Sequence, residues 1–129
     1  MNKIIVEVSI GELLDKISIL EIKQGKIKDP EKLKFINNEY SILKNQLEKS
    51  VKSDEKLNNL YQSLKEINAK LWIIEDDKRQ CEKDKDFGEK FIKLSRDVHF
   101  LNDDRAKIKL EINNLTGSAI KEIKEYTNY

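Results

Sequence analysis

Residues 91–115, FIKLSRDVHFLNDDRAKIKLEINNL, indicate a helical fold because their apolar side chains recur at helical spacing. They alternate three and four residues apart for more than three heptads, the pattern of a long helix packed on other helices. Asp86-Phe87-Gly88 predicts the turn before this helix, and Gly117 predicts its end. The core positions of the repeat are Phe91, Leu94, Val98, Leu101, Arg105, Ile108, Ile112 and Leu115.

Three more helices are predicted upstream of this repeat. Ser9 and Glu12 form a capping box, which predicts a helix over about 10–27. Asp29-Pro30 starts a second helix, because Asp caps a helix and Pro suits its first position. A turn signal at residues 50–53 and a slip of the heptad separate the second helix from a third, which ends near Lys83.

The predicted fold class is all-α, an antiparallel helical bundle with long helical hairpins. Lys3–Val8 predicts a short N-terminal β segment, and Ser118 predicts the cap of a short C-terminal helix. In that C-terminal helix the apolar side chains recur every three residues, at Ile120, Ile123 and Tyr126. The length of 129 residues fits a single helical-bundle domain over 1–129.

The composition favours neither nucleic acid nor a membrane as a partner. The chain carries 25 basic and 24 acidic side chains, a net charge of +1. No apolar run approaches the roughly 18 residues of a membrane span, and the N-terminus lacks a signal-peptide pattern. The single Cys81 has no second cysteine to pair with, which favours a reducing, cytoplasmic location.

Several polar side chains fall within the apolar stripes of the predicted helices. Burying a charge is costly unless it is paired, so two interpretations stay open. In the first, Glu75 and Glu21 neutralise Arg105 and Lys109 and fix the helix register. In the second, a pocket in the bundle receives an anionic ligand. The candidate ligand-binding residues are Glu21, Glu75, Arg79, Asn102, Arg105 and Lys109, and Asn68 shares a stripe with them.

No metal site, cofactor or catalytic residue is predicted. His99 lies with Arg96 and Asp103 on a flank of its helix, and one His with spaced carboxylates does not supply the ligands of a zinc site. We interpret this group as a solvated helix face. Cys81 has no evident partner that would stabilise a thiolate.

Each predicted helix also carries large apolar side chains outside its core stripe. Single exposed hydrophobic residues are ordinary, but their recurrence on all four helices indicates a second packing surface or an oligomer interface. Trp72, at the edge of its stripe, suits the anchor of such a contact. We therefore expect a homo-oligomer. The residues concerned are Ile19, Ile22, Phe35, Ile42, Ile73 and Phe100.

Four segments occur in a distinctive order along the chain. They are VSIGELLDKISILE at 8–21, LWIIED at 71–76, DFGEKF at 86–91 and LNDDRAKIKLEIN at 101–113. With DPEKL at 29–33, they resemble a family of small uncharacterised bacterial and phage proteins, a domain of unknown function. The resemblance implies no activity. It adds Asp15, Lys16, Trp72, Arg96 and Asp103 to the residues of interest, beside His99.

Two functions follow from the sequence. The first is a helical interaction module that self-associates, which the apolar residues outside the stripes favour. The alternative is a binding protein or small enzyme for an anionic metabolite or sugar derivative, which the polar layer favours. A chorismate-mutase type of helical enzyme is disfavoured, because residues 10–27 contain no Arg to clamp a carboxylate. Enzyme activity stays open, with the balance against it.

Overall fold

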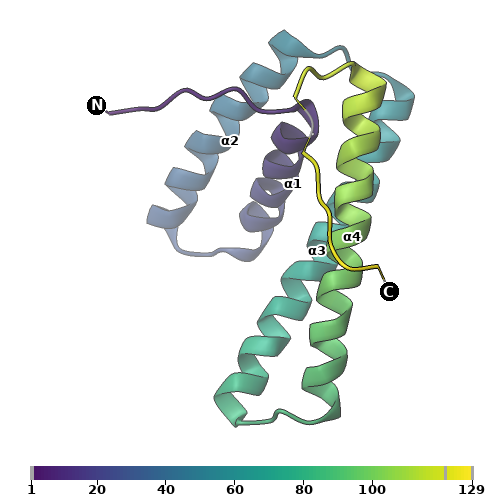
Figure 1. The fold of residues 1–129 in the computed structure, drawn as a ribbon. Coiled ribbons are helices and arrows are strands. Elements are labelled where there is room, and N and C mark those ends of the chain that lie inside the picture. The colour runs from purple at the N-terminus through teal and green to yellow at the C-terminus, as the bar shows by residue number, and fades with distance from the viewer. Residues whose placement is uncertain (1, 121, 129) are drawn as a thin grey trace.

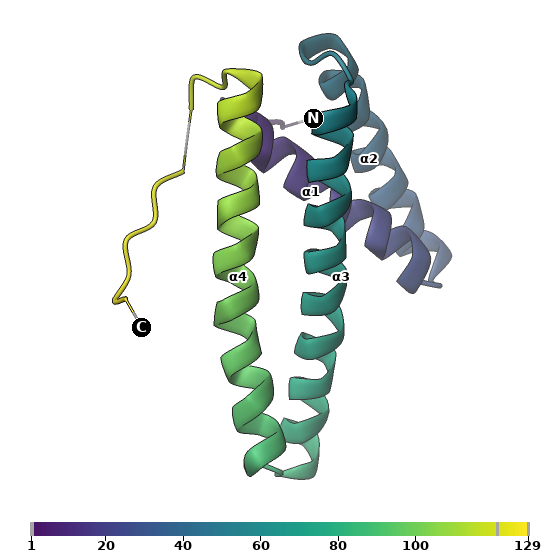
Figure 2. The same ribbon diagram turned by 90° about the vertical axis from the view of Figure 1, so that its right-hand side faces the viewer.

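The computed structural model of the protein describes residues 2–120 and 122–128. These residues form four helices, α1 (Ile10–Lys26), α2 (Pro30–Ser50), α3 (Glu55–Asp84) and α4 (Glu89–Thr116). α3 and α4 run side by side, and α1 crosses them with α2 on its outer side (Figure 1, Figure 2). The all-α class is thus confirmed. None of the four described helices is long and apolar enough to cross a membrane.

Side-chain caps start three of the helices where the sequence predicts them. Ser9 Oγ accepts a hydrogen bond from the backbone N–H of Glu12 at 3.0 Å. Asp29 Oδ1 accepts from Glu31 N–H at 3.1 Å, and Pro30 occupies the first helical position of α2. Asp54 Oδ1 accepts from Leu57 N–H at 2.7 Å. Each cap satisfies a backbone donor that has no partner within the helix. The predicted break between α2 and α3 is confirmed.

Two predicted terminal elements are not formed. Residues 3–8 adopt no strand, and no strand occurs among the described residues for this segment to pair with. Residues 118–120 and 122–128 adopt no helix, whereas Lys121 lies outside the described residues. The apolar side chains of the C-terminal segment stay in solvent, with Ile123 80% exposed. A helix this short is marginal in water without a surface to pack on.

α1 lies at the centre of the fold and packs against each of the other three helices. It contributes Leu14 to a core cluster that also contains Leu57 and Leu64 from α3 and Ile112 from α4. α2 approaches α1 closely but neither α3 nor α4, and Ile36 is its one buried side chain. α2 is therefore the most weakly seated of the four helices.

Beyond the crossing of α1, α3 and α4 continue as a two-helix projection (Figure 1). We call residues 72–101 the arm. Cys81 is the one buried side chain among these residues, all of which the structure describes. The arm ends at the turn of residues 85–88, where Lys85 adopts the left-handed conformation with φ 57°. The arm therefore has far less core than the end of the fold that α1 covers.

Candidate functional site

A buried carboxylate joins three helices where α1 crosses the α3–α4 pair. Asp15 of α1 is 2% exposed. Its Oδ1 accepts from Arg105 Nε at 2.9 Å and its Oδ2 accepts from Arg105 Nη2 at 2.5 Å. The guanidinium of α4 therefore binds the carboxylate in a bidentate manner. Asn68 of α3 donates from Nδ2 to Asp15 Oδ1 at 2.9 Å. Asn68 and Arg105 therefore meet at one carboxylate.

The remaining polar groups around Asp15 are also paired. Asn68 Nδ2 contacts Ser18 Oγ at 2.8 Å, and the Ser18 hydroxyl donates to the backbone carbonyl of Asp15 at 2.8 Å. Arg105 Nη1 donates to Asn102 Oδ1 at 3.3 Å. Among the described residues, no buried side-chain nitrogen or oxygen lacks a hydrogen-bond partner. The cluster is thus complete without an added ligand.

Lys109 supplies the second cation of this cluster. Its side chain is buried, and its Nζ lies 2.8 Å from Glu12 Oε2, 3.0 Å from Glu122 Oε2 and 4.0 Å from Asp15 Oδ2. Glu12 belongs to the first turn of α1, whereas Glu122 belongs to the segment that follows α4. Lys109 therefore ties the C-terminal segment to the start of α1.

The pKa values of the cluster show that its ionised forms are favoured. Burial alone would raise the pKa of Asp15, but hydrogen bonds from Arg105 and Asn68 and the two nearby cations bring it below its ordinary value. The hydrogen bond to Asp15 raises the pKa of Arg105. Burial would lower the pKa of Lys109, but its hydrogen bonds to Glu12 and Glu122 raise it. All three groups are charged at neutral pH.

The start of α1 lies unusually close to α4. The backbone N–H of Gly11 donates to Asn113 Oδ1 at 2.7 Å, and that of Ile10 donates to Ser118 Oγ at 3.3 Å. A Cβ at position 11 would stand 2.6 Å from the carbonyl oxygen of Lys109. Only glycine permits this approach, which brings Glu12 and Asp15 within reach of the α4 cations.

The predicted partners of the two cations were wrong. Glu21 accepts from Tyr40 Oη at 3.4 Å and from the Tyr61 hydroxyl, and it lies 3.7 Å from Lys65 Nζ. Glu75 is exposed and forms no ion pair with a described residue. Arg105 pairs with a carboxylate of α1, and Lys109 pairs with carboxylates of α1 and of the C-terminal segment.

An open groove lies against the exposed side of Arg105. Its volume is about 390 Å³, and we call it the Trp72 groove. It brings together four of the candidate residues, Glu75, Arg79, Arg105 and Trp72. The remaining lining residues are Ile19, Asn68, Leu71 and Asp76. Two of the three arginines of the chain and its single tryptophan therefore line one groove.

The other candidate residues lie elsewhere. Lys16 is exposed and pairs with Glu12 at 3.7 Å. Arg96 and His99 lie on the arm, and each contacts the ring of Phe100, at 5.9 and 4.6 Å respectively. Asp103 is half-buried on α4 and does not line the Trp72 groove. Among residues 2–120 and 122–128, no group of three or more His, Cys, Asp or Glu side chains could hold a metal ion.

The periodicity of apolar residues alone leaves Asp15 outside the core stripe of its helix, and it does not mark Ser18 or Asn113. The signal was present in α1, where Gly11, Asp15 and Ser18 follow each other at spacings of four and three. This spacing puts two small residues and one carboxylate on a single face. Small residues on one helix face permit the close approach of another helix, and a carboxylate between them needs a partner there.

Comparison with known proteins gives a family and no activity. No curated protein and no solved structure matches the chain. One family profile, described as a family of unknown function (DUF6165), matches residues 4–129, nearly the whole sequence. The chain therefore belongs to this family of unknown function, DUF6165.

Proposed function

We propose that the chain is an interaction module that associates with a second copy of itself through the arm. The observation that carries the proposal is the burial pattern of residues 72–101, where Cys81 alone is buried. Two packed helices cannot enclose a core between them, and stable helical folds add further helices to cover the apolar side. α1 and α2 do not supply that cover, because α1 crosses nearer the other end (Figure 1).

One face of the arm carries exposed apolar side chains among charged ones. Ile73 is 52% exposed and Ile92 is 55% exposed, one on each helix. Two neighbouring grooves of about 400 and 370 Å³ run along this face and share Asp97 and Phe100 in their lining. We call this surface the arm face. Ile74 and Leu101 also line it, and so do the charged side chains of Lys70, Glu89, Lys93 and Arg96.

The charges on the arm favour a second copy over an acidic or basic partner. The arm, residues 72–101, contains eight acidic and seven basic side chains. A surface with both signs in nearly equal number can complement itself when a two-fold axis brings it onto its own copy. Two arms packed in this way form a four-helix bundle, in which each covers the apolar face of the other.

Sedimentation velocity at tens of micromolar tests this proposal. The wild-type chain is expected to sediment as a dimer, and Ile73→Glu with Ile92→Glu is expected to sediment as a monomer with unchanged helical circular dichroism. Phe35→Glu is the matched control, since Phe35 on α2 is 77% exposed and lies off the arm. A monomeric wild type, or a dimer that survives the double change but not Phe35→Glu, would overturn the proposal.

A second candidate function is the binding of a small carboxylated or phosphorylated metabolite in the Trp72 groove. It is favoured by one observation, the meeting of Arg79, Arg105 and Trp72 in that groove. Arginine presents a planar fork that suits carboxylates and phosphates, and an indole offers a flat apolar wall. Arg105 already holds Asp15, so Arg79 is the cation with capacity for a ligand.

A thermal-shift screen with phosphorylated and carboxylated metabolites tests this second function. A ligand at a hundred times its dissociation constant stabilises the fold by about 2.7 kcal/mol. Arg79→Gln should abolish the shift without lowering the melting temperature of the free protein, because Arg79 is exposed and outside the Asp15 cluster. A shift that persists in Arg79→Gln places the ligand elsewhere, and the absence of any shift removes this function.

A further inference from the structure

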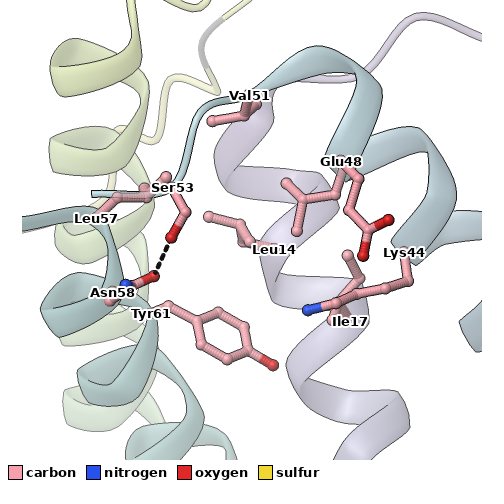
Figure 3. A pocket seen from close by; sticks show the side chains of 10 residues that line it. Leu14, Ile17, Lys44, Glu48, Val51, Ser53, Leu57, Asn58 and Tyr61 are labelled. Atoms are coloured by element: carbon pink, nitrogen blue, oxygen red, sulfur yellow. Dashed lines mark hydrogen bonds between the residues drawn. The ribbon is translucent and has the colours of Figure 1, made fainter. Parts of the chain in front are cut away.

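A pocket opens between α1, α2 and α3, and its lining shares no residue with the Trp72 groove or the arm. Its volume is about 240 Å³. Figure 3 shows side chains from the three helices around it, with Tyr61 extending from α3 towards α1 and α2. Its apolar lining includes two members of the core cluster, Leu14 and Leu57. The pocket therefore extends from the surface to the core of the protein.

The pocket exists because α2 is seated on α1 alone. Ile36 is the one side chain of α2 that is buried. Leu47, near the end of α2, and Val51, just after it, pack against the core cluster but stay half-buried. An apolar group placed between α2 and α3 would cover both side chains and remove further apolar surface from water. A ligand that fills this space would therefore gain binding free energy from the burial of apolar surface.

The rim of the pocket carries balanced charges. Lys44 and Glu48 lie on the α2 side, one of each sign. On the α3 side, Ser53 Oγ donates to Asn58 Oδ1 at 3.2 Å, which leaves neutral hydrogen-bonding groups at the edge (Figure 3). The Tyr61 hydroxyl is engaged by Glu21. A ligand with a net charge would meet one like and one opposite charge at this rim, so its attraction to one is offset by repulsion from the other. An uncharged polar group can use both donors and acceptors.

We propose that this pocket binds a small amphipathic molecule that has an aliphatic or single-ring body and an uncharged hydroxyl or amide head. The body lies on Leu14, Ile17 and Leu57, and the head meets the rim. Size supports this ligand class: an apolar cavity of about 150 Å³ already admits benzene. A pocket of about 240 Å³ therefore has room for such a body with a short polar substituent, but not for a helix of a partner protein.

A series of straight-chain alcohols from 1-butanol to 1-octanol is the first test. Each added methylene that enters the pocket should tighten binding about fourfold, because each contributes apolar burial. Binding is followed by NMR shifts of the Leu and Ile methyl groups of the intact chain. The gain should stop once the chain outgrows the pocket. A gain that continues to the longest alcohol, with shifts at the arm face, would overturn the proposal in favour of general partitioning.

The second test repeats the alcohol series on variants in which a larger side chain fills the pocket. Leu47→Phe places a larger side chain in the pocket and should abolish the alcohol-induced shifts. Ile42→Phe is the matched control on the same helix, because Ile42 is 59% exposed and does not line the pocket. Val51→Phe fills the space from the connection instead, in case Leu47→Phe disturbs α2. Unchanged binding in both filled variants, each folded by circular dichroism, would overturn the proposal.

Charged probes of equal chain length test the assignment of the head group. Hexanoate and hexylammonium should each bind more weakly than 1-hexanol, since attraction to one of Lys44 and Glu48 is offset by repulsion from the other and the lost hydration of the ion is not repaid. Hydrogen exchange gives a separate readout, because a ligand that seats α2 should slow the exchange of α2 amides more than those of the arm. Tighter binding of either ion, or no protection of α2, would contradict the proposal.

Discussion

The carboxylate of Asp15 and the guanidinium of Arg105, 90 positions apart in the sequence, form a two-pronged ion pair that fixes α1 on α4. Asp15 is almost wholly buried, whereas the Arg105 side chain keeps 29% of its surface exposed. The pair is therefore asymmetric. Loss of the cation leaves a buried charge, but loss of the carboxylate leaves a guanidinium that still reaches water.

Arg105→Met is expected to lower the free energy of unfolding by about 3 kcal/mol, because it leaves the Asp15 carboxylate with only Asn68 and the more distant Lys109. Asp15→Asn combined with Arg105→Met should cost much less than the sum of the two single changes, since neither charge is then left alone. Asn at position 15 keeps an oxygen for Asn68 to bind. Urea denaturation of the four proteins in this cycle measures the coupling.

Glu75→Gln supplies the control for that cycle. Glu75 lines the same groove as Arg105 but does not pair with it, so the two changes should be additive within about 0.5 kcal/mol. Strong coupling between Arg105 and Glu75, with none between Arg105 and Asp15, would mean that the ion pair described above is not the one that stabilises the fold.

The free energy of unfolding at acid pH should depend on the ionisation of Asp15. Its pKa in the folded protein is lowered, so the unfolded chain binds more protons and stability falls as the pH falls. The stabilising contribution of the ionised Asp15 is complete above pH 3.8, the ordinary pKa of the group in the unfolded chain. It is lost below that pH, as the pH falls through the lowered pKa of the folded protein. The difference in unfolding free energy between wild type and Asp15→Asn should therefore be constant near neutrality and shrink in acid. A difference that grows below pH 3.8 would contradict this.

The helices were predictable because their signals are local. Ser9, Asp29 and Asp54 each stand next to the helix they cap, and the spacing of apolar residues in 91–115 spans a whole helix. The terminal elements were not predictable on the same basis. A short apolar run such as Lys3–Val8 forms a strand only if another strand is present, and the local sequence carries no information about that.

The members of the polar layer were predictable, but their pairing was not. Asn68 and Arg105 interrupt apolar stripes and were identified for that reason. Their common partner, Asp15, lies on a second buried face of α1, because α1 is covered by three helices at once. A single stripe describes a helix with one buried face, so it leaves the other contacts of a central helix unassigned.

A pair of glycines in α1 gives opposite predictions for the same substitution. Gly11→Ala should lower the unfolding free energy by about 1–3 kcal/mol, because its Cβ would clash with the Lys109 carbonyl oxygen and Asn113 Oδ1. Gly25→Ala should raise it by up to about 1 kcal/mol, since nothing lies within 4 Å of that Cβ and Ala favours a helix. Thermal or urea denaturation measures both. Equal changes in unfolding free energy at the two positions would show that helix propensity, not the close approach of α4, determines the effect of substituting Gly11.

Cys81 reports on the arm, because it is the only cysteine of the chain and is 2% exposed. A thiol reagent can reach it only when the arm opens, so the labelling rate measures the population of the open arm. If two arms cover each other, opening requires dissociation first. Well above the dissociation constant, each tenfold rise in protein concentration should then slow labelling about threefold, as the monomer fraction falls with the square root of concentration. In the variant with Ile73→Glu and Ile92→Glu, Cys81 should be labelled at the same rate at every protein concentration. A wild-type labelling rate that is also independent of concentration would show that the arm opens without dissociation of a partner.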